Sequence, residues 1–377
     1  MTSAPLALSD PAAALAAFHS SFRLMIPRTT TPAPRLWIWL LWLGLFYAGW
    51  SWIVFAGARW SDVVAHWPIA LAMAAGSYVA GSTPMGGGTV GFPILVLLFE
   101  QPASLGRDFS FAVQSIGMTS ASIFIFARRL PLATDMLRGA MLGTLVGTPI
   151  GIAWIAPFVS GVWIKLAFAV VWASFGVLHL YRINEIAGAT GSGRSDRRWD
   201  FRVGLVVGLT AGATVASVTG VGIDMVLYAT LVLLCRTDLK VAIPTSVVIM
   251  AATSLIGIAW KNLTTGLQPG VFENWLAAAP IVALGAPLGV FVVNLVGRKP
   301  TLLFVAVLCV GQFVWTCYDE RASLGLSGTA AAAGAVLVVL LGFERLRSLG
   351  MARFSRRSAV AGSLDAQPTP IPVQPGT

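Results

Sequence analysis

The chain has 377 residues, of which 56% are hydrophobic and only 11% are charged, and its formal net charge is +10. Apolar runs long enough to cross a bilayer recur along most of the chain, which excludes an ordinary soluble domain and predicts an all-α polytopic membrane protein. The basic residues gather in short loops and at the two ends, so membrane topology explains the charge better than nucleic-acid binding does.

In chain order, the apolar runs predict two similar halves with additional segments at both ends. The N-terminal addition includes a Trp-rich span, and the longest polar segment separates the halves. We predict a cytoplasmic leader at 1–35, an extra membrane helix at 36–57, repeat 1 at 67–181, a cytoplasmic linker at 182–202, repeat 2 at 203–318, a C-terminal membrane helix at 324–343 and a disordered cytoplasmic tail at 344–377.

A glycine-rich stretch, Gly81–Gly91, interrupts the first half. It contains Pro84 and three successive glycines at 86–88, so it cannot form the interior of an ordinary helix. At membrane depth such backbone is tolerated only where it is buried in protein or lines a cavity. The stretch is therefore a candidate solute site, with a tight turn between packed helices as the alternative.

A second copy of this stretch favours the solute site. Two hydrophobic halves, each with a glycine-interrupted segment at the matching place, are typical of a transporter with a central binding site. Further along, Gly147–Gly151 resembles Gly285–Gly289. Residues of the first stretch recur 136 positions later, pairing Gly76 with Gly212, Ala80 with Ala216, Thr83 with Thr219 and Gly86 with Gly222.

The distribution of Lys and Arg predicts the orientation of the chain. With both termini inside, the broken hairpin of the first half enters the membrane from outside and that of the second half from inside, so the repeats are inverted. The sequence leaves open whether each hairpin is re-entrant or spans fully. The segments predicted to be cytoplasmic are 1–35, 128–138, 182–202, 236–240, 298–299 and 344–357, and those predicted outside are 58–66, 157–161, 261–274 and 319–323.

Polar groups at and near the two breaks are the candidate binding residues. A helix that restarts after a break presents free N–H groups and its positive end, which favours an anion, and hydroxyl or amide side chains can add donors. The alternative for each hydroxyl is a bond to its own helix. The candidate substrate-binding residues are Thr83, Gly86, Gly87, Gly88, Thr89, Gln114, Ser115, Ser217, Thr219, Gly220, Gly222, Thr245 and Ser246.

Asp224 is the single charged residue between Arg202 and Arg236. A carboxylate within an apolar broken helix costs several kcal/mol unless it pairs, caps the helix or takes up a proton. Asp224 is therefore a proton-coupling candidate, with helix capping as the structural alternative. His179 lies near the predicted end of its helix, and we expect it at the membrane interface.

No motif for catalysis is present. The chain lacks a nucleophile–base pair, Gly86–Thr89 lacks the lysine of a phosphate-binding loop, and the three cysteines have no metal-ligand spacing. We therefore predict no enzyme activity, no cofactor and no metal site. The expected partners are a small anionic substrate and membrane lipid, without nucleic acid, and assembly of two copies into a homodimer is left open.

With Gly86–Gly88, Pro93 and the second broken segment, residues 67–318 resemble the sulfite exporter TauE/SafE family of membrane transporters. The resemblance implies export of sulfite or a small organosulfonate such as sulfoacetate across the bacterial inner membrane. The second half departs from the family pattern, because it has Asp224 after its glycines and Ala229 where the first half has Pro93. The alternatives are a transporter of a cation or neutral solute that uses Asp224, and a membrane scaffold without transport.

Overall fold

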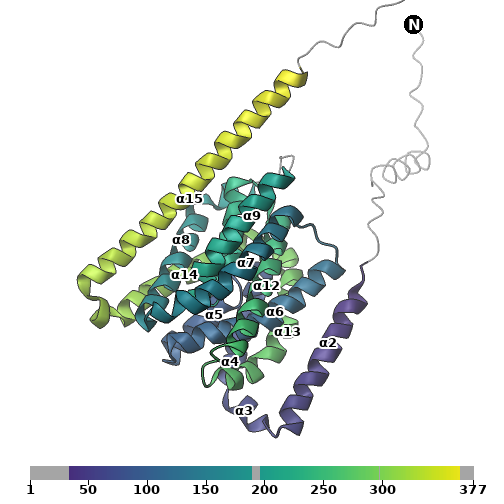
Figure 1. Cartoon of the computed structure of the whole chain (residues 1–377), viewed down its shortest axis with the longest axis vertical. Helices are drawn as coiled ribbons and strands as arrows, with labels where there is room; N and C mark the ends of the chain where they lie inside the picture. The colour runs from purple at the N-terminus through teal and green to yellow at the C-terminus, as the bar shows by residue number, and fades with distance from the viewer. Residues whose placement is uncertain (1–33, 189–195, 297, 366–377) are drawn as a thin grey trace, which may run out of the picture. The chain divides into compact units, whose positions relative to one another are not determined.

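The computed structural model describes residues 34–188, 196–296 and 298–365, and these ranges contain helices and no strand (Figure 1). In this part of the chain, nine helices are long and apolar enough to cross a membrane, which confirms the predicted all-α polytopic class. Large apolar side chains such as Trp37, Val206 and Phe304 stay exposed on the helix surfaces, as expected for side chains that face lipid. Residues 1–33 of the predicted leader lie outside the described ranges.

The helices follow the predicted order. The N-terminal segment comprises α2 (Leu36–Ser51), η1 (Trp52–Ala56) and α3 (Trp60–Ala65). The first half comprises α4 (Trp67–Ser82), α5 (Gly88–Pro93), η2 (Ile94–Leu98), α6 (Ala103–Ala127), α7 (Thr134–Trp154), η3 (Ala156–Phe158) and α8 (Gly161–Ala187). The second half comprises α9 (Arg197–Ala211), η4 (Gly212–Ala216), α10 (Ser217–Thr219), α11 (Ile223–Ala229), η5 (Thr230–Leu234), α12 (Leu239–Leu263), α13 (Val271–Val296) and α14 (Arg298–Asp319), and α15 (Arg321–Asp365) follows.

The prediction of a disordered tail from residue 344 is wrong for its first part, because α15 continues to Asp365. Contacts with α8 hold this part of the helix. The Tyr181 hydroxyl donates to Glu344 Oε1 at 2.7 Å, and Arg182 Nε donates to the same oxygen at 3.1 Å. Arg347 Nε pairs with the other Glu344 oxygen at 2.9 Å. The predicted 182–202 linker is also shorter, since α8 extends through Ala187 and α9 begins at Arg197.

The long helices pair across the two halves. The first helix of each half packs against the second-to-last long helix of the other, so that α4 contacts α13 and α9 contacts α7. Helix α6 packs against α12, and α8 packs against α14. Figure 1 shows α7 and α9 side by side. Each of these pairs therefore combines one helix from the first half with one from the second.

Small residues bring α7 and α9 into close contact. Gly139, Gly143 and Gly147 follow at intervals of four on α7, and Gly204 and Gly208 have the same spacing on α9. A Cβ added to Gly143 would lie 2.3 Å from the Leu205 carbonyl oxygen, and one added to Gly208 would lie 2.1 Å from that of Ala140. Because lipid provides no hydrophobic drive for helix association, such close backbone packing stabilises the pair.

The backbone conformation of the first half recurs in the second. The π-helical turns η2 and η5 begin 136 residues apart, at Ile94 and Thr230. The matched glycines, Gly86 and Gly222, both have positive φ, at +61° and +98°. Glu100 and Arg236, which are also 136 residues apart, have φ of +53° and +52°. The matched segments thus share their irregular conformations as well as their residue types.

The additional helix α2 supplies hydrogen bonds to α13. Pro280 has no N–H, so the Leu276 carbonyl four residues earlier loses its helical partner. Trp50 Nε1 donates to this carbonyl oxygen at 2.9 Å, and the Tyr47 hydroxyl donates to the Pro280 carbonyl at 2.6 Å. In a membrane, such donors replace water at carbonyls that proline leaves free. Helix α2 is therefore an integral part of the helical assembly.

We expect Trp50→Phe to lower the free energy of unfolding by about 1 kcal/mol, because it leaves the Leu276 carbonyl without its donor. Thermal unfolding of the detergent-solubilised protein measures the change. Trp52→Phe is the matched control, since the Trp52 side chain is 75% exposed. Equal losses in the two variants would show that the hydrogen bond contributes nothing.

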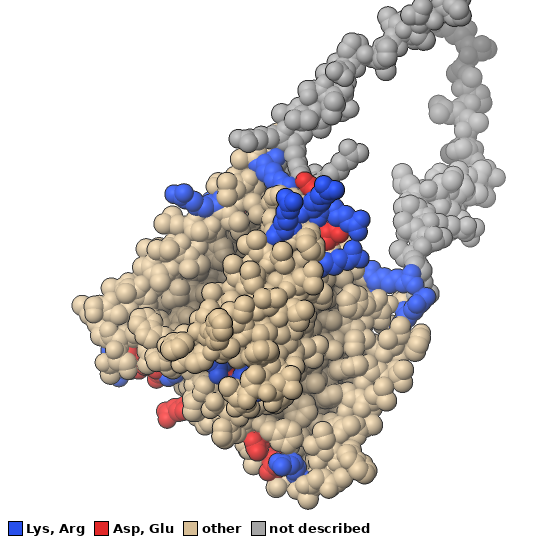
Figure 2. Space-filling view, in the orientation of Figure 1, with Lys and Arg blue, Asp and Glu red and all other residues tan. Residues whose placement is uncertain are grey.

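Lys and Arg side chains gather towards the end of the molecule at which α9 begins, whereas acidic and basic side chains are mixed at the opposite end (Figure 2). Segments that carry this charge include residues 128–138, which cover the loop before α7 and its first turn, and the start of α9. Such asymmetry is typical of a membrane protein whose basic end faces the cytoplasm.

Candidate functional site

Both predicted helix breaks are present in the structure. Helix α4 ends at Ser82, and the helix resumes at Gly88 after an irregular segment in which Gly86 has left-handed backbone. Helix α10 ends at Thr219, and α11 begins at Ile223 after Gly220 and Gly222, which both have positive φ. Glycine adopts this conformation without the steric cost that a Cβ imposes. The glycines in the two halves therefore serve the same purpose, which is to interrupt a helix.

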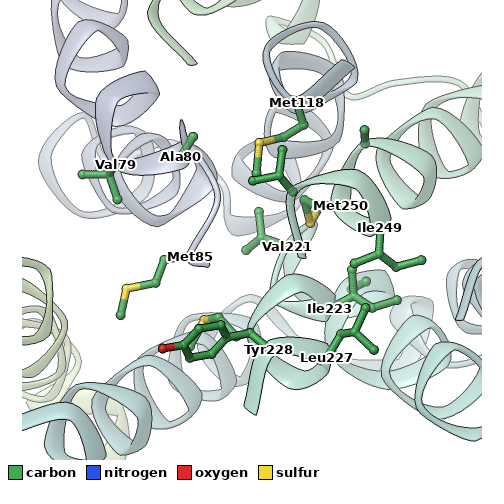
Figure 3. Packing of buried hydrophobic residues seen from close by; sticks show 14 of the residues in the cluster. Val79, Ala80, Met85, Met118, Val221, Ile223, Leu227, Tyr228, Ile249 and Met250 are labelled. Carbon is green, nitrogen blue, oxygen red and sulfur yellow. The ribbon is translucent and has the colours of Figure 1, made fainter. Parts of the chain in front are cut away.

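The two breaks touch each other. A Cβ added to Gly88 would lie 2.3 Å from Val221 Cγ1, so the restart of α5 lies directly against the second break. Met85 and Val221 belong to one buried apolar cluster together with Met118 and Met250 (Figure 3). The structure therefore brings the two irregular segments together among the central helices.

Two polar side chains converge on Gly86 at this contact. Gln114 of α6 and Asp224 of α11 are 2% and 0% exposed. A Cβ added to Gly86 would lie 2.4 Å from Gln114 Oε1 and 2.8 Å from Asp224 Oδ2. Neither of these oxygens has a hydrogen-bond partner in the described part of the protein. The candidate residues Gly86, Gln114 and Asp224 therefore form one group.

The other polar atoms of this group are hydrogen-bonded. Gln114 Nε2 donates to the Ser110 carbonyl at 3.2 Å and to the Gly220 carbonyl at 3.5 Å. Asp224 Oδ1 accepts the Met225 N–H at 3.0 Å. The N-cap of α11 is Gly222, and Asp224 lies within the first turn. Gln114 thus links α6 to the second break.

Several hydroxyls that were predicted to bind substrate donate instead to carbonyls of their own helices, as the alternative interpretation proposed. A hydroxyl has a single hydrogen, so it cannot donate to a substrate while it keeps this bond. The acceptors are the Val79 carbonyl for Thr83, the Ala112 carbonyl for Ser115, the Ala213 carbonyl for Ser217 and the Ile243 carbonyl for Ser246, at 2.6–2.8 Å.

Two further predicted threonines have different surroundings. Thr219 Oγ1 lies 2.8 Å from the Val215 carbonyl oxygen and 2.9 Å from that of Val221, so it contacts both its own helix and the second break. Thr245 donates to the carbonyl oxygen of Val241 and accepts the N–H of Ala133, in the loop before α7, at 3.0 Å. Thr245 therefore stabilises that loop rather than joining the group around Gly86.

Trp172 contacts both breaks, although the sequence pattern did not single it out. Its Nε1 donates to Thr89 Oγ1 at 2.7 Å, while Thr89 donates to the Met85 carbonyl. A Cβ added to Gly222 would lie 3.0 Å from the Trp172 ring. The fully buried indole stacks on Phe168 with ring centroids 3.9 Å apart, so its position is fixed by packing.

A buried charged cluster also escaped the sequence analysis. Asp108 of α6 is fully buried and pairs with Arg107 Nε at 2.9 Å and with Lys261 Nζ of α12 at 3.2 Å. The N–H of Gln268 donates to the same carboxylate at 3.2 Å. The sequence did contain a signal for this cluster, because its charged residues flank apolar runs. Lys261 and Gln268 lie far from Asp108 along the chain, so the sequence did not reveal these two contacts.

Two cavities approach the breaks. A cleft of about 620 Å³ is lined by Arg107, Lys165 and Glu320, and the Arg107 carbonyl would lie 2.3 Å from a Cβ added to Gly220. A second cavity, of about 220 Å³, reaches Gly81 at the end of α4. Each cavity therefore lies close to a different break.

His179 was expected at the membrane interface, and this expectation is wrong. The side chain is fully buried, with Nδ1 2.9 Å from the Phe175 carbonyl oxygen and Nε2 3.3 Å from the Tyr228 hydroxyl. The reason is that α8 continues to Ala187, two turns beyond His179. No group of three or more His, Cys, Asp or Glu side chains within the described ranges is arranged to hold a metal ion.

A comparison with protein-family models matches residues 68–315 to the family described as sulfite exporter TauE/SafE. Neither the curated proteins nor the solved structures contain a match to this chain. The matched region includes both glycine breaks, Gln114, Asp224 and the helices that pair across the halves. The chain therefore belongs to the sulfite exporter TauE/SafE family of membrane transporters.

Proposed function

We propose that this protein is a secondary transporter that exports a small anion, sulfite or an organosulfonate such as sulfoacetate, across the bacterial inner membrane. The observation that carries this proposal is the direct contact between two glycine breaks, one from each half. Membership in a family of sulfite exporters supports the substrate class. Irregular backbone at a central contact between two halves is the arrangement in which transporters bind their substrates.

Backbone N–H groups are the proposed anion donors. The N–H groups of Thr89 and Met225 already donate to the Gly86 carbonyl and to Asp224, so the proposed donors are the N–H groups that precede them at the start of each helix after a break. The positive helix end adds to the attraction. The helical segments that begin at Gly88 and Ile223 both start at the contact between the breaks. Since Thr83 and Ser217 donate to their own helices, the proposal assigns recognition to the backbone rather than to these hydroxyls.

We further propose that the halves form an inverted repeat and that transport proceeds by alternating access. The pairing of α4 with α13 and of α9 with α7 supports this arrangement, because equivalent helices exchange partners. In the proposed orientation both termini are cytoplasmic. The cleft near Arg107 then faces outside and the cavity near Gly81 faces the cytoplasm. Each break would be reached from a different side of the membrane.

This orientation predicts opposite labelling of two loops. In a background without Cys235, Cys309 and Cys317, a cysteine at Arg129 should react with a membrane-impermeant maleimide only after the cells are opened. A cysteine at Thr265 should react in intact cells. Labelling of both positions from the same side would contradict the inverted topology.

Efflux from proteoliposomes tests the substrate class. Vesicles loaded with sulfite or sulfoacetate should lose the anion faster than protein-free vesicles, and excess unlabelled sulfite inside should compete. Efflux of a cation or a neutral solute in place of the anions would support the alternative in which Asp224 is the counter-charge. If none of the anions, the cation or the neutral solute leaves the vesicles faster than it leaves protein-free vesicles, the protein would be a scaffold rather than a transporter.

A further inference from the structure

Two buried oxygens without partners lie beside the same backbone position, Gly86, at the contact between the breaks. They are Gln114 Oε1 on α6 and Asp224 Oδ2 on α11, and both side chains are at least nine-tenths buried. Both oxygens lie within 2.8 Å of the position of a Cβ on Gly86, so they are close neighbours. Buried acceptors without donors are rare in proteins, and such a pair needs a physical explanation.

The orientation of the Gln114 amide is set by its surroundings. Its Nε2 donates to two carbonyl oxygens, those of Ser110 and Gly220. Rotating the amide by half a turn would place Oε1 against both carbonyl oxygens, which repel it, and would leave the Gly220 carbonyl without this donor. The amide oxygen therefore lies beside Gly86, and the donor that it needs cannot come from Gln114 itself.

These two oxygens fit a proton better than a metal ion. Hard cations in proteins take about six oxygen ligands, whereas this group offers two free oxygens. One proton satisfies both oxygens at once. Asp224 Oδ1 already accepts the Met225 N–H, so Oδ2 is the oxygen that is free to carry it.

We propose that Asp224 holds a proton on Oδ2 and donates it to Gln114 Oε1, which makes this pair a proton-binding site linking α6 to α11. Proton uptake converts the carboxylate to a carboxylic acid and forms one O–H···O hydrogen bond, and no other bond changes. The proton is thus a second ligand at the contact between the breaks. The coupling of this proton to anion transport rests on the proposed function, whereas the binding of the proton to Asp224 does not.

Ionisable groups on the surrounding helices have partners elsewhere. On α6 and α12, Arg107 and Lys261 pair with Asp108. His179 of α8 contacts the Phe175 carbonyl and Tyr228 of α11. The ionised side chains of α9 are confined to its first six residues, and Lys240 lies at the start of α12. None of these described groups has a contact with Asp224 that would supply the missing donor.

Protonation of Asp224 has a direct consequence for anion binding. A neutral Asp224 lets an anion approach the N–H groups after the breaks, whereas a carboxylate beside Gly86 repels it. Proton and anion therefore strengthen each other's binding, and by linkage the effect is reciprocal. Anion binding should draw protons from solution when the site is not fully protonated.

Infrared spectroscopy of the purified protein in lipid vesicles, without any added anion, tests the proton site. At neutral pH, the wild type should show the carbonyl stretch of a protonated carboxyl group, and this band should shift in D₂O. Asp224→Asn should remove the band, while the control Asp238→Asn, at an exposed N-cap of α12, should retain it. A wild-type spectrum from which Asp224→Asn removes nothing would overturn the proposal.

A second variant tests the pairing with Gln114. Gln114→Leu should keep the carboxyl band but move it to the position of a more weakly hydrogen-bonded acid. An unchanged band position in a folded Gln114→Leu protein would overturn the pairing. If this variant does not fold, the difference between the wild type and Asp224→Asn still decides whether Asp224 holds the proton.

Calorimetry then separates this inference from the proposed function. Titration of sulfoacetate, which is fully ionised at neutral pH, in buffers with different ionisation enthalpies measures the protons that the protein takes up per anion, and Asp224→Asn should reduce that number to zero. Equal proton uptake in wild type and variant would overturn the coupling. If no anion binds but the infrared band is present, the proton site stands and the proposed anion substrate fails.

Discussion

Gly86→Ala should abolish anion efflux, whereas Gly87→Ala should retain it. At Gly86, φ is +61°, and an added methyl group would lie 2.4 Å from Gln114 Oε1 and 2.8 Å from Asp224 Oδ2. The variant therefore suffers backbone strain and pushes apart the two side chains that meet at the breaks. Strain of about 1–3 kcal/mol in this conformation alone lowers the population of the native break by a factor of about 5 to 140.

The neighbouring Gly87 is a sharp control for this prediction. It has ordinary helical backbone, and the nearest atom to an added Cβ is Met73 Cε at 3.3 Å, the flexible end of a side chain. Efflux of radiolabelled sulfite from proteoliposomes, normalised to folded protein by size-exclusion chromatography, gives the comparison. Efflux in Gly86→Ala equal to that of the wild type would mean that the irregular conformation at Gly86 is dispensable.

Asp108→Ala should cost about 3–5 kcal/mol of stability, because it leaves the buried charges of Arg107 and Lys261 without their counter-charge. It also removes the acceptor of the Gln268 N–H, which anchors the loop between α12 and α13. This is the largest stability effect that we expect from a single side chain. A protein of marginal stability would lose most of its folded population.

The control for this prediction is an ion pair at the surface. Asp62 pairs with Arg59 at 3.4 Å, and both side chains are substantially exposed. Asp62→Ala should therefore change stability by about 0–1 kcal/mol. Thermal unfolding of both variants in the same detergent makes the comparison. Similar shifts would show that the buried cluster contributes no more than an exposed pair does.

The sequence predicted the parts of the fold that follow from local chemistry. Apolar runs predicted the helices, and glycines with proline predicted the two breaks, because these residues change the backbone whatever surrounds them. The match of Gly86 with Gly222 extended to their positive φ values. The extent of α15 was less predictable, since its last part depends on partners such as Tyr181 that lie far away in the sequence.

The candidate site was predicted less completely. The sequence identified Gln114 and Asp224 as separate candidates but could not show that their oxygens meet beside Gly86. It also could not decide that Thr83 and Ser217 donate to their own helices, because this depends on whether a better acceptor lies nearby. Trp172 looked like any other apolar residue of a membrane helix, and only the fold places it against both breaks.

The exchange of helix partners has a consequence for how the protein can move and assemble. Since α4 packs with α13 and α9 with α7, neither half of the sequence has a complete set of contacts by itself. Any motion that preserves these pairs must carry segments of both halves as one rigid body, so the hinges cannot coincide with the linker between the halves. During synthesis, the packing of the first half also cannot be completed until α13 has left the ribosome. Helix α4 is therefore in the membrane without its partner while more than 180 further residues are made.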